Sequence, residues 1–157
     1  MQIKLLTVGK TDNPAIQQLV EEYAGRLTHY IRFELEVIPD LRNTKSLSEL
    51  IQKEKEGDLI LKKIQSSDEL ILLDERGKSF GSMEFSELVQ KKMNSGLKQL
   101  VFVIGGPYGF SEAVYQRANA KISISKMTFS HQMIRPFFIE QLYRAFTILR
   151  NEPYHHE

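Results

Sequence analysis

Two adjacent glycines that directly follow an apolar run are the first residues able to form a ligand site. The run "VFVIGGPYGF" (Val101–Phe110) meets them at Gly105 and Gly106. A dinucleotide fingerprint needs G-x-G-x-x-G after the first strand, and a P-loop needs a following Lys-Ser/Thr; neither pattern is present. Pro107 has no N–H to offer a phosphate. The stretch predicts either a backbone ledge for a flat ligand such as adenosine, at the carboxyl end of a strand, or only a tight turn.

The stretch "ISISKMTFSHQMIR" (Ile122–Arg135) is the second candidate. Small hydroxyl residues are followed by Met127, Phe129 and His131 at the start of a helix. Isolated residues of these types are more commonly core, surface or cap residues than catalysts. No second His or carboxylate stands at metal-ligand spacing, so we expect no metal site.

The C-terminal stretch "LYRAFTILRNEPYHHE" is the third candidate. Arg144 falls in the polar gap beside an apolar helical stripe, and Pro153 ends the helix before Tyr154 and His155. A Tyr-His pair could stack on a base, donate hydrogen bonds or move protons near neutral pH. The alternative is a frayed chain end.

A fourth stretch, "LLDERGKSFGS" (Leu72–Ser82), also ends a buried strand and places Asp74, Glu75 and Arg76 in the loop that follows. The carboxyl ends of parallel strands meet at one edge of a sheet. Three of the candidate loops are therefore expected to form a single pocket.

The elements that must position these residues alternate between strand and helix, which predicts an α/β fold with a mainly parallel sheet and flanking helices. The third and fourth strands are near-continuous apolar runs, as expected of strands covered on both faces. We expect strands at Ile3–Val8, Phe33–Ile38, Glu69–Asp74, Leu100–Ile104 and Lys121–Ser125. We expect helices from Asn13-Pro14 to Leu27, from a capping box at Ser46–Glu49 to about Ile64, from Ser82 to Ser95-Gly96, a short one capped by Ser111, and Gln132–Arg150.

Length and composition limit the class of protein. At 157 residues, the chain is expected to form one domain over 1–157. No apolar run approaches the ~20 residues of a membrane span, and the N-terminus lacks a signal-peptide pattern. The absence of cysteine excludes disulfides, thiolate metal sites and a cysteine nucleophile, and it fits a cytoplasmic location.

Charge is distributed unevenly along the chain. Residues 1–75 carry 10 Lys/Arg against 14 Asp/Glu, whereas residues 76–157 carry 11 against 6. The candidate loops after the glycines thus lie in the basic half, which would attract an anionic partner such as RNA. A chance imbalance is the alternative.

Taken together, the motifs resemble the ribosomal RNA large subunit methyltransferase H family of SPOUT (α/β-knot) methyltransferases. The resemblance covers nearly the full length and rests on "LLTVGK", "LLDERGK", "VFVIGGPYG", "ISISKMTFSHQMIR", "EQLYRAF" and "NEPYH", in this order. It implies a deep trefoil knot in the C-terminal part, a homodimer, and S-adenosylmethionine as the cofactor. The implied reaction is methylation at N3 of a pseudouridine in helix 69 of 23S rRNA, in the assembled ribosome.

Residue by residue, the resemblance assigns the cofactor contacts to Leu73, Gly105, Ile124, Ser125, Lys126, Met127, Thr128 and Phe129. It assigns contacts with the target nucleotide to Arg144, Tyr154 and His155. We expect Arg144 to anchor a phosphate or base oxygen, Tyr154 and His155 to orient the base, and His155 to accept the N3 proton. Positioning and charge stabilisation would supply most of the catalysis, without a metal.

Two other functions stay open. The chain could be a SPOUT methyltransferase with another RNA target, such as tRNA. It could also be a non-catalytic RNA-binding assembly factor that shares the fold. A nicotinamide-dependent enzyme is disfavoured, because the glycines follow the wrong strand at the wrong spacing.

Overall fold

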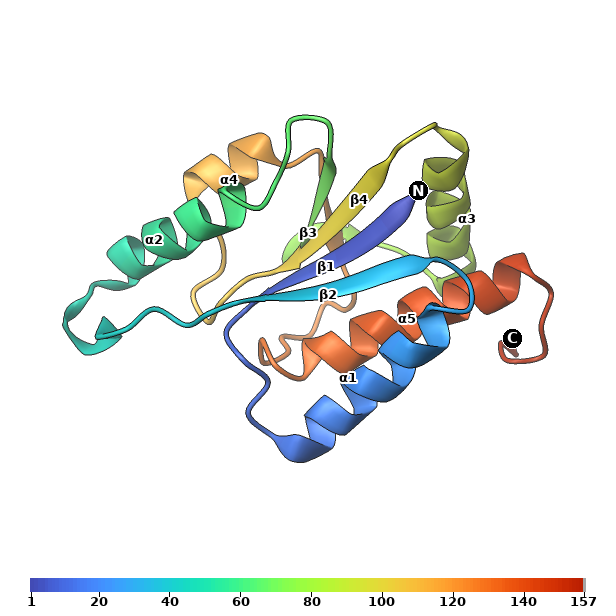
Figure 1. The fold of residues 1–157 in the computed structure, drawn as a ribbon, viewed down its shortest axis with the longest axis horizontal. Helices are drawn as coiled ribbons and strands as arrows, with labels where there is room; N and C mark the ends of the chain where they lie inside the picture. Colours follow the sequence, from blue (N-terminus) through green and yellow to red (C-terminus); the bar gives the residue numbers. More distant parts are fainter. Residues whose placement is uncertain (157) are drawn as a thin grey trace.

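The computed structural model describes residues 1–156 and shows a five-stranded parallel sheet in the order β2-β1-β4-β3-β5. The strands are β1 (Gln2–Val8), β2 (Arg32–Ile38), β3 (Glu69–Ser79), β4 (Gln99–Ile104) and β5 (Ala120–Ser123). The helices are α1 (Pro14–Leu27), α2 (Glu49–Leu61), α3 (Ser82–Asn94), α4 (Glu112–Arg117) and α5 (Ile134–Leu149). The expected parallel α/β sheet with flanking helices is confirmed (Figure 1).

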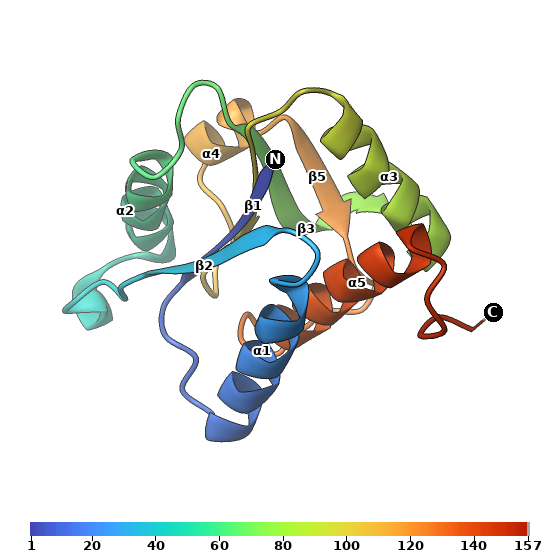
Figure 2. The same cartoon turned by 45° about the vertical axis from the view of Figure 1, so that its right-hand side comes forward.

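Helices cover both faces of the sheet, which explains the near-continuous apolar strands. Successive side chains of a strand point to opposite faces, so Leu5 and Phe102 join one core with α1, α3 and α5. Leu6 and Val103 join a second core with α2 and α4. Figures 1 and 2 show the two layers on either side of the sheet. Because all strands run parallel, their carboxyl ends share one edge.

Local capping signals set most helix boundaries as expected. The Asn13 side chain accepts from the N–H of Ala15 at 2.9 Å, and Ser111 caps α4 by accepting from Val114. Gly96 takes a φ of 79° just after α3, as a glycine at that position allows. The capping box at Ser46 is wrong. Ser46 ends a 3₁₀ turn, and Ser48 instead caps α2 by accepting from Ile51 at 3.2 Å.

Strand β3 does not end at Asp74. Leu73 and Lys78 both pair with Ile122 of β5, so residues 74–77 leave the ladder as a bulge and the strand then continues to Ser79. The bulge returns very close to β5: a Cβ on Gly77 would lie 2.5 Å from the Ile122 carbonyl carbon. Only glycine fits this crossing. The expected loop is therefore a bulge within one strand, held on both sides by β5.

The apolar stripe of α5 forms core. Phe138, Leu142 and Phe146 are buried in the layer with α1 and α3, so most of the stripe packs within this chain. Phe137 is the exception and remains 45% exposed. The helix begins at Ile134 instead of Gln132, and Met133 precedes it without a side-chain cap.

Candidate functional site

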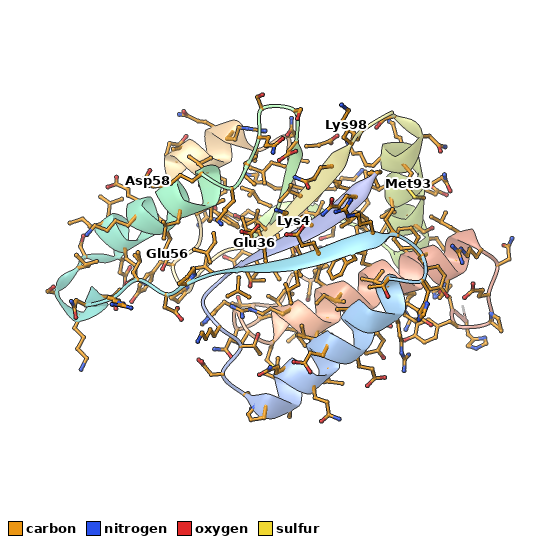
Figure 3. All side chains as sticks on the ribbon, in the orientation of Figure 1. Lys4, Glu36, Glu56, Asp58, Met93 and Lys98 are labelled. Atoms are coloured by element: carbon orange, nitrogen blue, oxygen red, sulfur yellow. The ribbon has the colours of Figure 1, made fainter. Side chains whose placement is uncertain are left out.

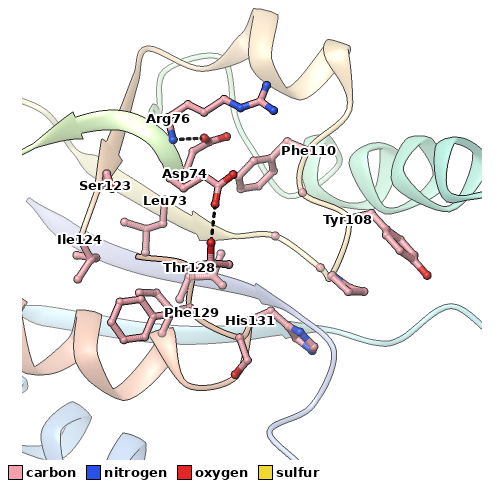
Figure 4. A pocket seen from close by; sticks show the side chains of 18 of the residues that line it. Leu73, Asp74, Arg76, Tyr108, Phe110, Ser123, Ile124, Thr128, Phe129 and His131 are labelled. Carbon is pink, nitrogen blue, oxygen red and sulfur yellow. Dashed lines mark hydrogen bonds between the residues drawn. The ribbon is translucent and has the colours of Figure 1, made fainter. Parts of the chain in front are cut away.

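Three loops at the carboxyl edge of the sheet enclose a cavity of about 540 Å³, as the sequence predicted. They are the bulge after Leu73, the glycine turn after Ile104 and the segment between β5 and α5 (Figure 4). The cavity is lined by Lys53, Leu73, Asp74, Glu75, Arg76, Ile104, Gly105, Gly106, Pro107, Tyr108, Gly109, Phe110, Tyr115, Ser123, Ile124, Ser125, Met127, Thr128, Phe129, Ser130, His131 and Ile134.

Asp74 fixes one wall of the cavity. Its Oδ1 accepts from the N–H of Arg76 at 2.8 Å, which shapes the bulge, and its Oδ2 accepts from the Tyr115 hydroxyl on α4 at 2.5 Å. Burial, with Asp74, raises the pKa of Tyr115 to about 12. Tyr115 therefore stays protonated at neutral pH and serves as a hydrogen-bond donor.

The loop between β5 and α5 is folded by its own hydroxyl groups. Ser123 donates to the Ser125 carbonyl at 2.7 Å, and the Ser125 hydroxyl accepts from the N–H of Met127 at 3.0 Å. Thr128 then donates to Glu75 at 3.2 Å, which joins this loop to the bulge across the cavity (Figure 4). The small hydroxyl residues noted in the sequence thus shape the pocket.

Arg135 anchors the far end of the same loop. Its side chain is 1% exposed and donates to the carbonyl of Val8 at 2.7 Å, to the Thr11 hydroxyl at 2.9 Å and to the carbonyl of His131 at 3.1 Å. Burial, with the charge of Arg135, lowers the pKa of His131, which lines the cavity. His131 is therefore a neutral group of the pocket wall near pH 7.

Seven of the eight residues expected to contact the cofactor line the cavity: Leu73, Gly105, Ile124, Ser125, Met127, Thr128 and Phe129. Lys126 is exposed and does not line it. A side-chain-free ledge faces apolar side chains and a few hydroxyls, within the size range of small-molecule sites. This donor set fits a ligand with a flat ring and a short polar arm, as S-adenosylmethionine has.

The three residues expected to serve the nucleotide gather elsewhere, at the C-terminal end of α5. Glu140 accepts from Arg144 at 2.6 Å and from the Tyr154 hydroxyl at 2.9 Å. His155 places Nδ1 3.5 Å from the Arg144 guanidinium. Burial first, then hydrogen bonds with the Tyr23 hydroxyl and Glu140, raises the pKa of Tyr154, so the phenol stays protonated. We call Glu140, Arg144, Tyr154 and His155 the tail cluster.

The tail cluster does not reach the cavity of its own chain. Ile134 lines the cavity at the start of α5, and Arg144 follows ten residues later, about 15 Å along the helix at 1.5 Å per residue. Figure 1 shows the C-terminus at the opposite end of α5 from the loop that precedes this helix. The sequence predicted both groups of residues, and the fold separates them.

Sequence reasoning missed two residues that line the cavity: Lys53 of α2 and Tyr115 of α4. Phe110, which also lines it, closes the glycine stretch that the sequence pointed to. Lys53 and Tyr115 carry no such signal, because they enter the cavity from helices packed over the sheet. Among residues 1–156, no three His, Cys, Asp or Glu side chains gather in a way that could hold a metal ion. Within the same residues, every helix is too short or too polar to span a membrane.

Comparison with known proteins gives matches over the whole length. A family model described as "Predicted SPOUT methyltransferase" matches residues 1–155. Ribosomal RNA large subunit methyltransferase H of Flavobacterium johnsoniae is 66% identical over 157 residues, which cover 100% of both chains. The protein of the same name from Christiangramia forsetii is 65% identical over 156 residues, 99% of each chain. That from Porphyromonas gingivalis is 59% identical over 157 residues, again all of both chains.

Proposed function

The chain belongs to the SPOUT methyltransferase family, and from this premise we propose that it methylates N3 of a pseudouridine in helix 69 of 23S rRNA, using S-adenosylmethionine. Membership of an α/β-knot family also confirms the fold expected for the C-terminal part. The observation that carries the proposal is the cavity at the carboxyl edge, formed by the segments that the family resemblance assigns to the cofactor. We further propose that the protein works in the cytoplasm, on the assembled ribosome, as one domain.

The cavity residues bind and orient the cofactor in this proposal. The Gly105–Gly106 ledge gives a flat ring access to the backbone, while Leu73, Ile124 and Phe129 provide apolar contacts. When bound, S-adenosylmethionine supplies an electrophilic methyl group on a sulfonium. The pocket needs to contribute no metal and no covalent intermediate to such a transfer, and its role is to hold both reactants in line.

The tail cluster binds and orients the target nucleotide in this proposal. Arg144 offers a cation to a phosphate or a base oxygen, and Tyr154, whose hydroxyl donates to Glu140, orients the base with its aromatic ring. The N3 atom must lose its proton as the methyl group arrives, and the imidazole of His155 is the group of the cluster that we assign to accept it. The guanidinium of Arg144 would stabilise the negative charge that develops on the base.

A second copy of the chain completes the site. Since the tail cluster lies about 15 Å along α5 from the cavity of the same chain, we propose a homodimer in which the tail of one protomer serves the cavity of its partner. The exposed Phe137 lies one turn after Met133, which is 41% exposed, and its ring centre is 5.2 Å from that of Phe129 in the cavity wall. This apolar surface beside the cavity suits a protomer contact.

Mass spectrometry of 23S rRNA from a strain that lacks the gene tests the proposal. The expected result is the loss of one methyl group from the helix 69 pseudouridine and its return with the plasmid-borne gene. An unchanged helix 69 would refute the assigned target. Methyl transfer by the purified protein, measured on ribosomes and on tRNA in parallel, separates the rRNA target from a tRNA target. Calorimetry with S-adenosylmethionine separates an enzyme from an assembly factor, which has no reason to bind the cofactor.

A further inference from the structure

Glu56 is a buried carboxyl group for which the proposed reaction has no role. It lies on the inner face of α2 with Gly57 and Ile60 and is 4% exposed (Figure 3). A buried carboxyl group is costly unless its oxygens find partners. The burial of Glu56 therefore has to be offset by contacts with its surroundings.

The Glu56 carboxyl group lies directly against the glycine ledge. Its Oε1 accepts from Gln52 Nε2 at 2.9 Å, whereas its Oε2 has no hydrogen-bond partner among the residues that the structure describes. A Cβ on Gly106 would lie 3.0 Å from the Glu56 Cδ and 3.1 Å from Oε1, so the carboxyl group fills the place of a side chain at residue 106. Gly106 thus separates the cavity from the carboxyl group.

Helix α2 is packed closely beside the ledge. A Cβ on Gly57 would lie 3.0 Å from the Ser111 Cβ and 3.2 Å from the Val114 Cγ2, so the backbone of α2 packs directly on the start of α4. One turn before Glu56, Lys53 of α2 lines the cavity itself. The ledge therefore lies between the cavity and a closely packed helix.

We propose that Glu56 is a positioning residue for cofactor binding: its carboxyl group, oriented by Gln52, holds the Gly105–Gly106 ledge where the flat part of the methyl donor must dock. Glu56 touches the ledge and not the ligand. The inference rests on the proposed function. Shape and the Gln52 hydrogen bond carry the effect, so an amide of the same shape should replace the carboxyl group. Burial, and the nearby Asp40 charge, raise the pKa of Glu56, which favours the neutral form that an amide imitates.

Calorimetric titration of the full-length protein with S-adenosylmethionine tests the proposal. Glu56→Ala leaves a void behind Gly106, and we expect the Kd for S-adenosylmethionine to rise about tenfold or more, because a displaced contact surface loses binding. For Glu56→Gln, the Kd should stay within about threefold of the wild-type value, because the amide has the same shape and its oxygen can still accept from Gln52. The matched control is Glu54→Ala, an exposed position on the same helix, which should leave the Kd unchanged.

Comparing the KM for S-adenosylmethionine with the KM for ribosomes distinguishes a positioning role of Glu56 from a general loss of folded structure. At a temperature where each variant is fully folded by circular dichroism, Glu56→Ala should raise the KM for S-adenosylmethionine and leave the KM for ribosomes unchanged. Wild-type affinity in Glu56→Ala would overturn the inference, and so would a Glu56→Gln variant as weak as Glu56→Ala. If the wild-type protein itself does not bind S-adenosylmethionine, the proposed function fails and the inference with it.

Discussion

The guanidinium carbon of Arg144 lies 4.7 Å from the centre of the Tyr154 ring, so the cation covers one face of the phenol. Both side chains also donate to the same carboxylate oxygen of Glu140. The stack brings the C-terminal tail back onto α5. The helix does not end at Pro153 as predicted: it ends at Leu149, and Asn151 then turns the chain with a left-handed φ of 55°. A flat, charged group is thus held over an aromatic ring at the place proposed for the target nucleotide.

Replacing Arg144 by Lys should lower methyl transfer even though the charge remains. Lysine cannot form the planar stack on Tyr154 or offer a fork of donors. We expect kcat/KM on ribosomes to fall about tenfold or more, equivalent to about 1.4 kcal/mol of transition-state stabilisation. Arg26→Lys, which alters a similar stack on Tyr23 at 4.8 Å in α1, is the control and should remain near wild type. Full activity of Arg144→Lys would show that only charge matters there.

Two inactive variants should restore each other. Gly105→Val fills the ledge, since a Cβ there already lies 3.1 Å from the Phe110 ring, and His155→Ala removes the proposed proton acceptor. If sites form between protomers, half of the dimers in an equal mixture are mixed and each has one intact site, so activity should return to about a quarter of wild type.

The assay is methyl transfer on ribosomes after the two proteins are mixed, unfolded and refolded together. Each variant refolded alone is the control and should stay inactive. A mixture as inactive as its components would mean that pocket and tail belong to the same protomer. Near-normal turnover of His155→Ala alone would instead remove the assignment of His155 as the proton acceptor.

The sequence predicted a mainly parallel sheet and the three loops of the cavity, because these depend on local patterns: apolar runs, caps and glycines. It failed where the structure depends on contacts between distant segments. The bulge after Leu73 arises because Ile122 pairs with β3 twice, which no local pattern reveals. Glu56 is one of several charged residues in α2, and it is buried only because α2 packs over the glycine turn.

Binding to ribosomes should weaken steeply as salt rises. The net charge of the chain is only +1, but residues 76–157 hold an excess of five basic residues, and a dimer presents this half twice. Each phosphate neutralised by Lys or Arg releases a condensed cation, so the logarithm of the affinity should fall linearly with the logarithm of salt. Filter binding between about 50 and 200 mM KCl measures the slope. A flat dependence would argue against an RNA substrate.

Removing the buried cation Arg135 should destabilise the fold. Arg135→Met leaves two carbonyls and a hydroxyl without their donor, at Val8, His131 and Thr11. An unsatisfied buried polar group costs about 1–3 kcal/mol, and we expect a loss of about 2–4 kcal/mol in all. Urea unfolding at neutral pH measures it. Thr11→Val removes only one of the three partners and should cost less than Arg135→Met; equal losses would contradict this account.

The stability difference between Glu56→Gln and the wild type should change with pH. Burial raises the pKa of Glu56 in the folded protein above its ordinary 4.5, so the folded state holds this proton more tightly than the unfolded state. Between 4.5 and the raised pKa, the wild type therefore loses stability as pH rises, and an amide at residue 56 does not.

Urea unfolding at about pH 4, 6 and 8 measures the difference, because the other titrating groups contribute equally to both proteins and cancel. We expect the free energy of unfolding of Glu56→Gln, relative to the wild type, to increase from the lowest pH to the highest. Glu54→Gln, exposed on the same helix, should show a nearly constant difference over this range. A constant difference for Glu56→Gln would mean that the carboxyl group titrates alike in both states, and its burial would then impose no cost on the charged form.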